Sequence, residues 1–194
     1  MELPTDKKYQ IVYADPPWFY SNGIRSGKKD GMGRHLFYTP STTVGARYET
    51  QSDEWIKKLP VKSIADNDSI LFLWTTDSHL PIAIDVIKSW GFKYKTIGFI
   101  WNKKEKSGKQ VCYYGQYTMK GSEICLLAIK GKAHKLLKSH KVRQLVEAER
   151  DRKKHSQKPD EVRTRIVELM GDLSRIELFA RQRTEGWDVW GNEV

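Results

Sequence analysis

The chain has 194 residues, 39% of them hydrophobic and 11% aromatic, which is enough apolar material for a folded core and argues against a disordered chain. No apolar run approaches the roughly 20 residues of a membrane helix, and the polar segment 1–10 carries no secretory signal, so we expect a soluble, cytoplasmic protein. Lys and Arg number 34 against 24 Asp and Glu, and the net charge of +10 favours a polyanionic partner such as nucleic acid.

The sequence predicts a single domain over 1–194, because it contains no internal repeat, low-complexity tract or linker. Only two cysteines occur, Cys112 and Cys125, so nothing indicates a disulfide framework and we expect both thiols to be reduced. The five histidines show no zinc-ligand spacing with these cysteines, and we expect no metal.

The first predicted element is a short buried strand over 11–14, which ends at the rigid turn 15–17. Residues 19–50 lack hydrophobic periodicity and are rich in Gly, Ser, Thr, Lys and Arg, which predicts a long loop. Ser52 then caps a short helix over 53–59, because its side chain can accept a hydrogen bond from a free N–H of the first turn.

The continuous apolar run 69–75 is typical of a buried parallel strand. A helix follows over 78–90, with Pro81 in its first turn and Gly91 directly after its last residue. Its apolar residues recur at helical spacing, which predicts that one face packs on the sheet. The next strand covers 94–101.

Residues 102–119 form a second polar, basic segment, which we interpret as a loop, and 122–129 is another buried strand. Residues 132–154 hold many basic side chains around a short apolar run, and a solvated connection is the simplest interpretation of most of those charges.

Pro159 starts the next helix and Gly171 ends it, and 175–180 is the last clear strand. Strands therefore alternate with helices along the chain. This alternation predicts an α/β fold around a mostly parallel sheet.

The tetrapeptide Asp15-Pro16-Pro17-Trp18 is the most informative motif, because it directly follows a buried strand. Ligands of open α/β sheets bind beyond the carboxyl ends of the strands, so the motif lies where a substrate is expected. A Pro-Pro turn beside an incidental aspartate is the alternative explanation.

The motif suits methylation of an aromatic amine such as that of adenine. The lone pair of this amine is delocalised into the ring, and acceptors for both N–H groups would push the nitrogen toward tetrahedral geometry. The Asp15 carboxylate is one such acceptor, and the Pro16 carbonyl, whose direction the proline ring restricts, is the other. Trp18 offers a flat face on which a base can stack.

With this motif the chain resembles the MT-A70 family of adenine-N6 methyltransferases, in particular its bacterial and phage DNA enzymes. The resemblance extends from about Tyr9 to the C-terminus and rests on segments that occur in the family's order. These are YADPPW at 13–18, ILFLWTT at 70–76, WGF at 90–92, KGSEICLLAIKG at 120–131, HSQKPDE at 155–161, RIELFAR at 175–181 and WDVWGNE at 187–193.

The resemblance implies a circularly permuted Rossmann-like fold, with helices on both faces of the sheet and S-adenosylmethionine as cofactor. It places Lys158 near the methionine carboxylate of the cofactor. The cofactor-binding residues that it implies are His155, Lys158, Glu177, Phe179, Arg181, Gln182, Arg183 and Asn192. No G-x-G turn follows Phe179, and only ten residues precede Ile11, so the contacts to the cofactor's adenine ring stay open.

Two basic segments with interleaved aromatic residues are candidates for binding phosphates and bases. Tyr48 is added because it matches a pocket tyrosine of the family. The predicted substrate-binding residues are Tyr20, Arg25, Lys28, Lys29, Arg34, Tyr48, Lys103, Lys104 and Tyr117.

The expected partner is nucleic acid, and we expect no membrane partner. DNA is favoured over RNA because the compact chain is most similar to the bacterial and phage members. Two alternatives remain, an RNA adenine-N6 methyltransferase and a non-catalytic nucleic-acid-binding subunit, and a homodimer or a partner subunit is compatible with each.

Overall fold

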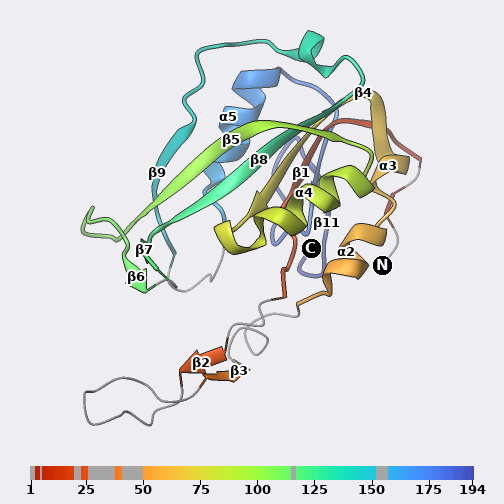
Figure 1. Ribbon diagram of the computed structural model, residues 1–194. Helices are drawn as coiled ribbons and strands as arrows, with labels where there is room; N and C mark the ends of the chain where they lie inside the picture. The colour runs from red at the N-terminus through yellow and green to blue at the C-terminus, as the bar shows by residue number, and fades with distance from the viewer. Residues whose placement is uncertain are drawn as a thin grey trace, which may run out of the picture.

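The structure is a computed structural model that describes residues 3–4, 6–19, 23–25, 38–40, 50–114, 117–151 and 157–194. Its main sheet has the strand order β11-β10-β1-β4-β8-β5-β9 (Figure 1). The strands of this sheet are β1 (Tyr9–Ala14), β4 (Ala65–Thr75), β5 (Lys93–Lys104), β8 (Ser122–Lys130), β9 (Leu145–Glu149), β10 (Arg175–Leu178) and β11 (Asp188–Trp190).

The sheet is mostly parallel, as predicted. β11, β10, β1 and β4 run in one direction, and β5 and β9 also pair in parallel. β8 is the exception, because it pairs antiparallel with both β4 and β5. The carboxyl ends of β10, β1 and β4 therefore meet at one edge of the sheet, and the start of β8 lies at that same edge.

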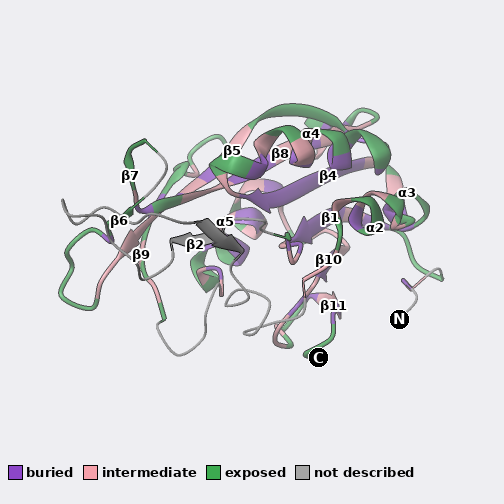
Figure 2. Cartoon of the chain, turned by 60° about the horizontal axis from the view of Figure 1, so that its bottom comes forward, coloured by how far each residue is buried: buried purple, intermediate pink, exposed green. Residues whose placement is uncertain are grey.

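Helices cover both faces of the sheet (Figure 1). α2 (Asp53–Lys58), α3 (Val61–Ile64) and α4 (Leu80–Ser89) pack in one apolar cluster, and α5 (Asp160–Met170) packs in the other. In Figure 2 the buried residues run along β1 and β4, between these two layers. The expected α/β fold with helices on both faces is confirmed, and the circular permutation stays a prediction.

The predicted helix boundaries hold where capping chemistry defines them. The Ser52 side chain accepts the Trp55 N–H at 3.2 Å, so α2 starts at the expected residue. Gly171 ends α5 and Gly91 follows α4, each with a left-handed φ that favours glycine. A single 3-10 turn, η1 (Asp77–His79), precedes α4.

The structure differs from the sequence prediction in the segments predicted as loops. β5 continues to Lys104, and a hairpin of β6 (Tyr113–Tyr114) and β7 (Met119–Lys120) lies within the predicted loop 102–119. The predicted connection 132–154 contains η2 (Ala133–Leu136) and the strand β9, and β11 follows the strand predicted as the last one. These strands are short or lie at sheet edges, so they lack the continuous apolar run that marks a central strand.

In the segment predicted as the loop 19–50, β2 (Gly23–Arg25) and β3 (Tyr38–Pro40) form an antiparallel pair. Cys112 and Cys125 are both free thiols, as expected. Among the described residues, no helix has the length and apolar character required to cross a membrane.

Candidate active site at the carboxyl edge of the sheet

The Asp15-Pro16-Pro17-Trp18 turn begins directly after β1, between the ends of β10 and β4. The Trp18 N–H donates to the Pro16 carbonyl at 2.9 Å, which closes the turn. The Pro17 carbonyl accepts the Gln51 N–H at 3.0 Å, so the residue that leads into α2 is tied back to the motif. The predicted catalytic residues are thus held at the edge where ligands of such sheets bind.

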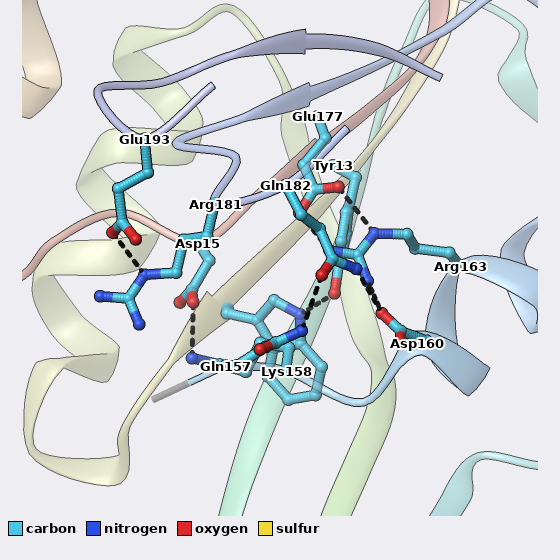
Figure 3. Close-up of polar contacts among 11 residues, drawn as sticks. Tyr13, Asp15, Gln157, Lys158, Asp160, Arg163, Glu177, Arg181, Gln182 and Glu193 are labelled. Carbon is cyan, nitrogen blue, oxygen red and sulfur yellow. Dashed lines mark hydrogen bonds and ion pairs between the residues drawn. The ribbon is translucent and has the colours of Figure 1, made fainter. Parts of the chain in front are cut away.

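Asp15 is joined to two residues that are distant in sequence. Lys158 Nζ lies 2.7 Å from Asp15 Oδ2 and 3.2 Å from Glu123 Oε2 (Figure 3 shows the first pair). The same Nζ lies 5.5 Å from the centre of the Trp74 ring. Lys158 is buried, whereas the Asp15 side chain is 22% exposed, so the carboxylate faces outward from a fixed cation.

The charges of this cluster depend on one another. Burial raises the pKa of Asp15 above its ordinary value, although Lys158 opposes the shift. Burial also disfavours the charged form of Lys158, but Asp15 and Glu123 outweigh it and raise the pKa of the lysine. Glu123 is partly buried, yet Lys158 and Lys103 hold its pKa below its usual range. The ammonium group is therefore the centre that keeps both carboxylates ionised.

Glu123 was not predicted as a site residue. It stands at the start of β8, and only the antiparallel direction of β8 brings that start to the edge where β1 ends. An acidic residue at the head of a buried apolar strand is the signal that was available in the sequence.

Trp18 occupies a different environment from the one predicted. Its ring is only 3% exposed, its Nε1–H donates to the Trp74 carbonyl at 3.0 Å, and His79 lies against it at 5.8 Å between ring centres. The indole therefore anchors the turn in the core, and base stacking on this ring stays a prediction. The side chain that emerges beside the turn is the exposed Phe19.

Glu177 also has a structural partner. Its two oxygens accept hydrogen bonds from Arg163 at 2.6 and 2.7 Å, and Glu177 is 4% exposed (Figure 3). Arg163 additionally donates to Asp160 at 2.6 Å and lies over the Tyr13 ring at 5.6 Å. With both oxygens accepting hydrogen bonds from Arg163, Glu177 links β10 to α5, and its contact with the cofactor stays a prediction.

The other predicted cofactor residues lie along the turn after β10 and the end of β11. Arg181 pairs with Glu193 at 3.0 Å, and Gln182 bonds Gln157 at 3.1 Å and Asp160 at 3.0 Å (Figure 3). Three further residues complete this part of the site: Phe179 is partly buried, whereas Arg183 and Asn192 are exposed.

The turn after β10 fits tightly against the end of β11. Phe179 has a left-handed φ of 62°, and its ring lies 5.4 Å from that of Trp190. The Ala180 N–H donates to the Trp190 carbonyl at 3.0 Å. A Cβ on Gly191 would lie 2.3 Å from the Ala180 carbonyl oxygen, so only glycine permits this approach.

Two predicted substrate cations already have carboxylate partners. Lys103 pairs with Glu123 at 2.5 Å, and Lys104 pairs with Glu147 at 2.7 Å. Their predicted role in binding substrate stays a prediction, which these pairings do not test. Tyr117 is 98% exposed near the β6–β7 hairpin, as a residue that stacks on bases requires.

Several predictions fall where the structure gives no description. Arg25 lies in β2, but its side chain is not among those described. The remaining such residues, all outside the described part of the chain, are Tyr20, Lys28, Lys29, Arg34, Tyr48 and His155.

The residues present fit S-adenosylmethionine by the chemistry of their charges. The buried cation of Lys158 suits the carboxylate of a methionine group, and the neighbouring Asp15 and Glu123 suit cationic ammonium and sulfonium centres. Glu193, beyond the end of β11, can accept hydrogen bonds from ribose hydroxyls.

The family model of MT-A70 matches residues 9–193. The whole chain is 37% identical to the Type II methyltransferase M.MunI of Mycoplasma sp and covers 80% of that protein. It is 27% identical to the N(6)-adenosine-methyltransferase MT-A70-like protein of Drosophila melanogaster and 25% identical to the N(6)-adenosine-methyltransferase catalytic subunit METTL3 of Homo sapiens. Those alignments cover 96% of this chain but only 27% and 28% of the two longer proteins. The chain therefore belongs to the MT-A70 family.

Proposed function

We propose that this site transfers a methyl group from S-adenosylmethionine to the N6 amine of adenine in DNA, and that residues 1–194 act as a single methyltransferase domain. The observation that carries the proposal is the cluster of Asp15, Lys158 and Glu123 beside the rigid Asp15-Pro16-Pro17 turn. It provides an ionised carboxylate and a backbone carbonyl at one sheet edge, which is what an aromatic amine requires.

Two acceptors of the chain hold the amine. Lys158 bonds Asp15 through Oδ2, so Oδ1 accepts one N–H of the adenine amine. The Pro16 carbonyl accepts the Trp18 N–H with one lone pair, and its second lone pair accepts the other N–H of the amine. Bonding both protons localises the nitrogen lone pair and directs it away from the two acceptors.

S-adenosylmethionine, when bound, supplies a methyl carbon that is activated by the adjacent sulfonium. The protein contributes mainly position, which can account for roughly 7–11 kcal/mol of a barrier. It needs no strong base, because the methylated nitrogen loses its proton readily. Lys158 serves both ligands, since it keeps Asp15 ionised and offers its charge to the methionine carboxylate.

The β6–β7 hairpin extends the site toward the nucleic acid. Tyr114 and Tyr117 are 92% and 98% exposed, and Lys103 lies 5.9 Å from the centre of the Tyr113 ring. Lys103 also bonds Glu123, so the hairpin is linked to the catalytic cluster. We infer that these tyrosines stack on bases next to the target adenine, which must leave its duplex or be single-stranded to reach Asp15.

DNA is the proposed substrate because the chain is 37% identical to the Type II methyltransferase M.MunI and covers 80% of that protein. The relatives named for adenosine, a ribonucleoside, match at only 27% and 25%. Oligonucleotides of equal sequence in DNA and RNA form, offered in competition and analysed for N6-methyladenine by mass spectrometry, test this preference. Faster methylation of RNA would favour the alternative RNA activity.

The variant Asp15→Asn tests the catalytic role, with Asp85→Asn as its matched control. Asp85 is an exposed carboxylate on α4 and, among the described residues, forms an ion pair with Lys88 at 3.4 Å. We expect Asp15→Asn to abolish methyl transfer and Asp85→Asn to leave it unchanged. Full activity of Asp15→Asn would refute the proposal. DNA binding without any binding of S-adenosylmethionine, measured by calorimetry on the unaltered chain, would favour the non-catalytic subunit.

A further inference from the structure

The connection between β8 and β9 carries a concentration of positive charge that the catalytic site does not use. From 124 to 146 the chain contains no Asp or Glu. Within this stretch six Lys and Arg residues form what we call the basic track: Lys130, Lys132, Lys135, Lys138, Lys141 and Arg143. All except the partly buried Lys130 are exposed, as are His134 and His140.

The basic track differs from other cations of the protein in lacking partners. Lys103, Lys104 and Arg165, for example, each pair with a glutamate. Within the described ranges, no ion pair involves any cation of the basic track, and Lys130 donates only to the Ala65 carbonyl, at 2.9 Å. Within the described residues, no ion pair therefore neutralises the positive charge of this surface.

The pKa of Lys130 reflects the charges around the start of the basic track. Burial lowers the pKa of Lys130, and the like charges of Lys62 and Lys8 lower it further, although Asp66 opposes the shift. Lys93 begins β5 beside Ile129 of β8, which adds another exposed cation at the same end of the sheet. An anion placed here would relieve repulsion that the folded protein retains.

The backbone of the basic track is fastened to the core at several points. The Lys132 N–H donates to Asp68 at 2.6 Å. The Lys138 and Ser139 N–H groups donate to the Leu169 carbonyl at the end of α5, at 2.9 and 3.1 Å. Farther along, Arg165 of α5 donates to the Arg143 carbonyl at 2.6 Å. The cations are thus presented from a fixed backbone, which reduces the entropy lost when a ligand binds.

The course of the basic track connects the far end of the sheet with the catalytic edge. Lys130 is in register with Ser69, at the end of the sheet opposite Asp15. Leu145, two residues after the basic track ends, is in register with Ile100 of β5. Ile100 and Thr75, the last residue of β4, are both in register with the same residue of β8, Ile124. The end of the basic track is therefore level with the carboxyl end of β4. In Figure 1 this connection (teal) runs over the top of α5 and down to β9. A polyanion along it would approach the catalytic edge from the α5 face.

We propose that the basic track binds the phosphate backbone of nucleic acid that flanks the target adenine. A linear ligand with regularly spaced negative charges matches a line of unpaired cations that leads to the catalytic edge. The inference rests on the proposed function only in that the ligand is nucleic acid, and it holds for any base or methylation site. Contacts of this kind position the ligand without selecting its sequence.

The test compares Lys132→Gln/Lys135→Gln/Lys138→Gln with Lys7→Gln/Lys58→Gln/Lys88→Gln. The control triple removes the same charge from exposed lysines of the N-terminal segment, α2 and α4. Binding of a long duplex without a target site is measured by fluorescence anisotropy over a range of salt concentrations, without cofactor. We expect the first triple to weaken binding about tenfold at low salt and to lower the slope of log affinity against log salt by about three. We expect the control triple to change the slope by less than one.

Equal slopes for the two triples would overturn the proposal, because net charge alone would then explain binding. Tighter binding to vesicles with anionic headgroups than to duplex, lost only in the first triple, would overturn it in favour of a membrane surface. The assay requires no methyl transfer, so Asp15→Asn should bind the duplex like the unaltered chain. Failure of the proposed function would appear as inactivity with the salt slope intact.

Discussion

Lys158 Nζ lies 2.7 Å from Asp15 Oδ2, although 143 positions separate the two residues in the chain. The segment before α5 and the end of β1 meet only because β10 brings α5 back beside the first strand. The pair joins the residue expected to bind the amine to the residue expected to bind the cofactor. One ammonium group thus sets the charge state on which both ligands depend.

Replacing Lys158 with methionine should therefore impair both catalysis and cofactor binding. The variant leaves two partly buried carboxylates without their shared cation, and we expect kcat/KM to fall by about 100-fold or more. Lys158→Arg, which keeps the charge but not the shape of the ammonium, should retain an intermediate activity. Steady-state kinetics and calorimetric titration with S-adenosylmethionine check this, and normal cofactor affinity in Lys158→Met would contradict the assigned role.

The loss of activity at low pH should follow the protonation of the Asp15 carboxylate. Because burial raises the pKa of Asp15 and the ionised carboxylate is the active form, activity should be lost on acidification at a pH above that of an ordinary aspartate, about 3.9. In Lys158→Met the cation that opposes this shift is gone, so the loss of activity should move to still higher pH. Profiles of kcat/KM against pH for both proteins, with Lys88→Met as control, measure the displacement. If kcat/KM of Lys158→Met falls at the same pH as in the unaltered protein, or at a lower pH, a group other than Asp15 controls the loss of activity.

The Arg163–Glu177 pair should contribute to stability more than to chemistry. Arg163→Met leaves Glu177 buried and unpaired, which costs about 3–5 kcal/mol of unfolding free energy. Arg163→Met/Glu177→Gln removes the stranded charge and should recover part of that loss. Urea unfolding of the two single variants and the double variant gives the coupling energy. Additive effects would mean that the two side chains do not act as a pair.

Gly191→Ala tests the contact between β11 and the turn after β10. Its new Cβ would meet the Ala180 carbonyl oxygen at 2.3 Å, so we expect a loss of about 1–3 kcal/mol and weaker binding of S-adenosylmethionine. Gly108→Ala is the contrast, because it meets no atom within 4 Å but has a left-handed φ of 80°. That variant should lose about 1–2 kcal/mol from backbone strain alone, with cofactor affinity unchanged. Thermal unfolding and calorimetry separate the two effects.

The exposed tyrosines of the β6–β7 region should matter for substrate and not for folding. Tyr114→Ala/Tyr117→Ala should leave the unfolding free energy within about 0.5 kcal/mol. If each ring stacks on a base, affinity for single-stranded DNA should fall by about 1–3 kcal/mol per ring. Tyr94→Ala, at the opposite end of β5, is the matched exposed control. Equal DNA affinity in the double variant and the control would remove these rings from the substrate surface.

The central strands and the catalytic turn could be predicted because they have strong local signals. The apolar runs 69–75 and 122–129 and the capping residues Ser52 and Gly171 determine structure within a few neighbours. Strand direction has no such signal, so Glu123 was missed although its strand was recognised.

Ion pairs between residues that lie far apart in the sequence could not be predicted either. The pairing of Lys103 with Glu123 could not be predicted from the sequence, because the two residues lie 20 positions apart on neighbouring strands. The edge strand β9 was missed because Val146 is its one fully buried residue, and a single apolar contact leaves no periodicity in the sequence.

The hydrogen bond from Gln51 to Pro17 has a consequence for how this protein can diversify. It joins the two ends of the segment 19–50 at its base, next to the buried Trp18. Doubling the length of such an insertion adds only about 0.6 kcal/mol of closure entropy. A change in the length of this segment should therefore cost the fold little, because the hydrogen bond at its base holds the catalytic turn in place.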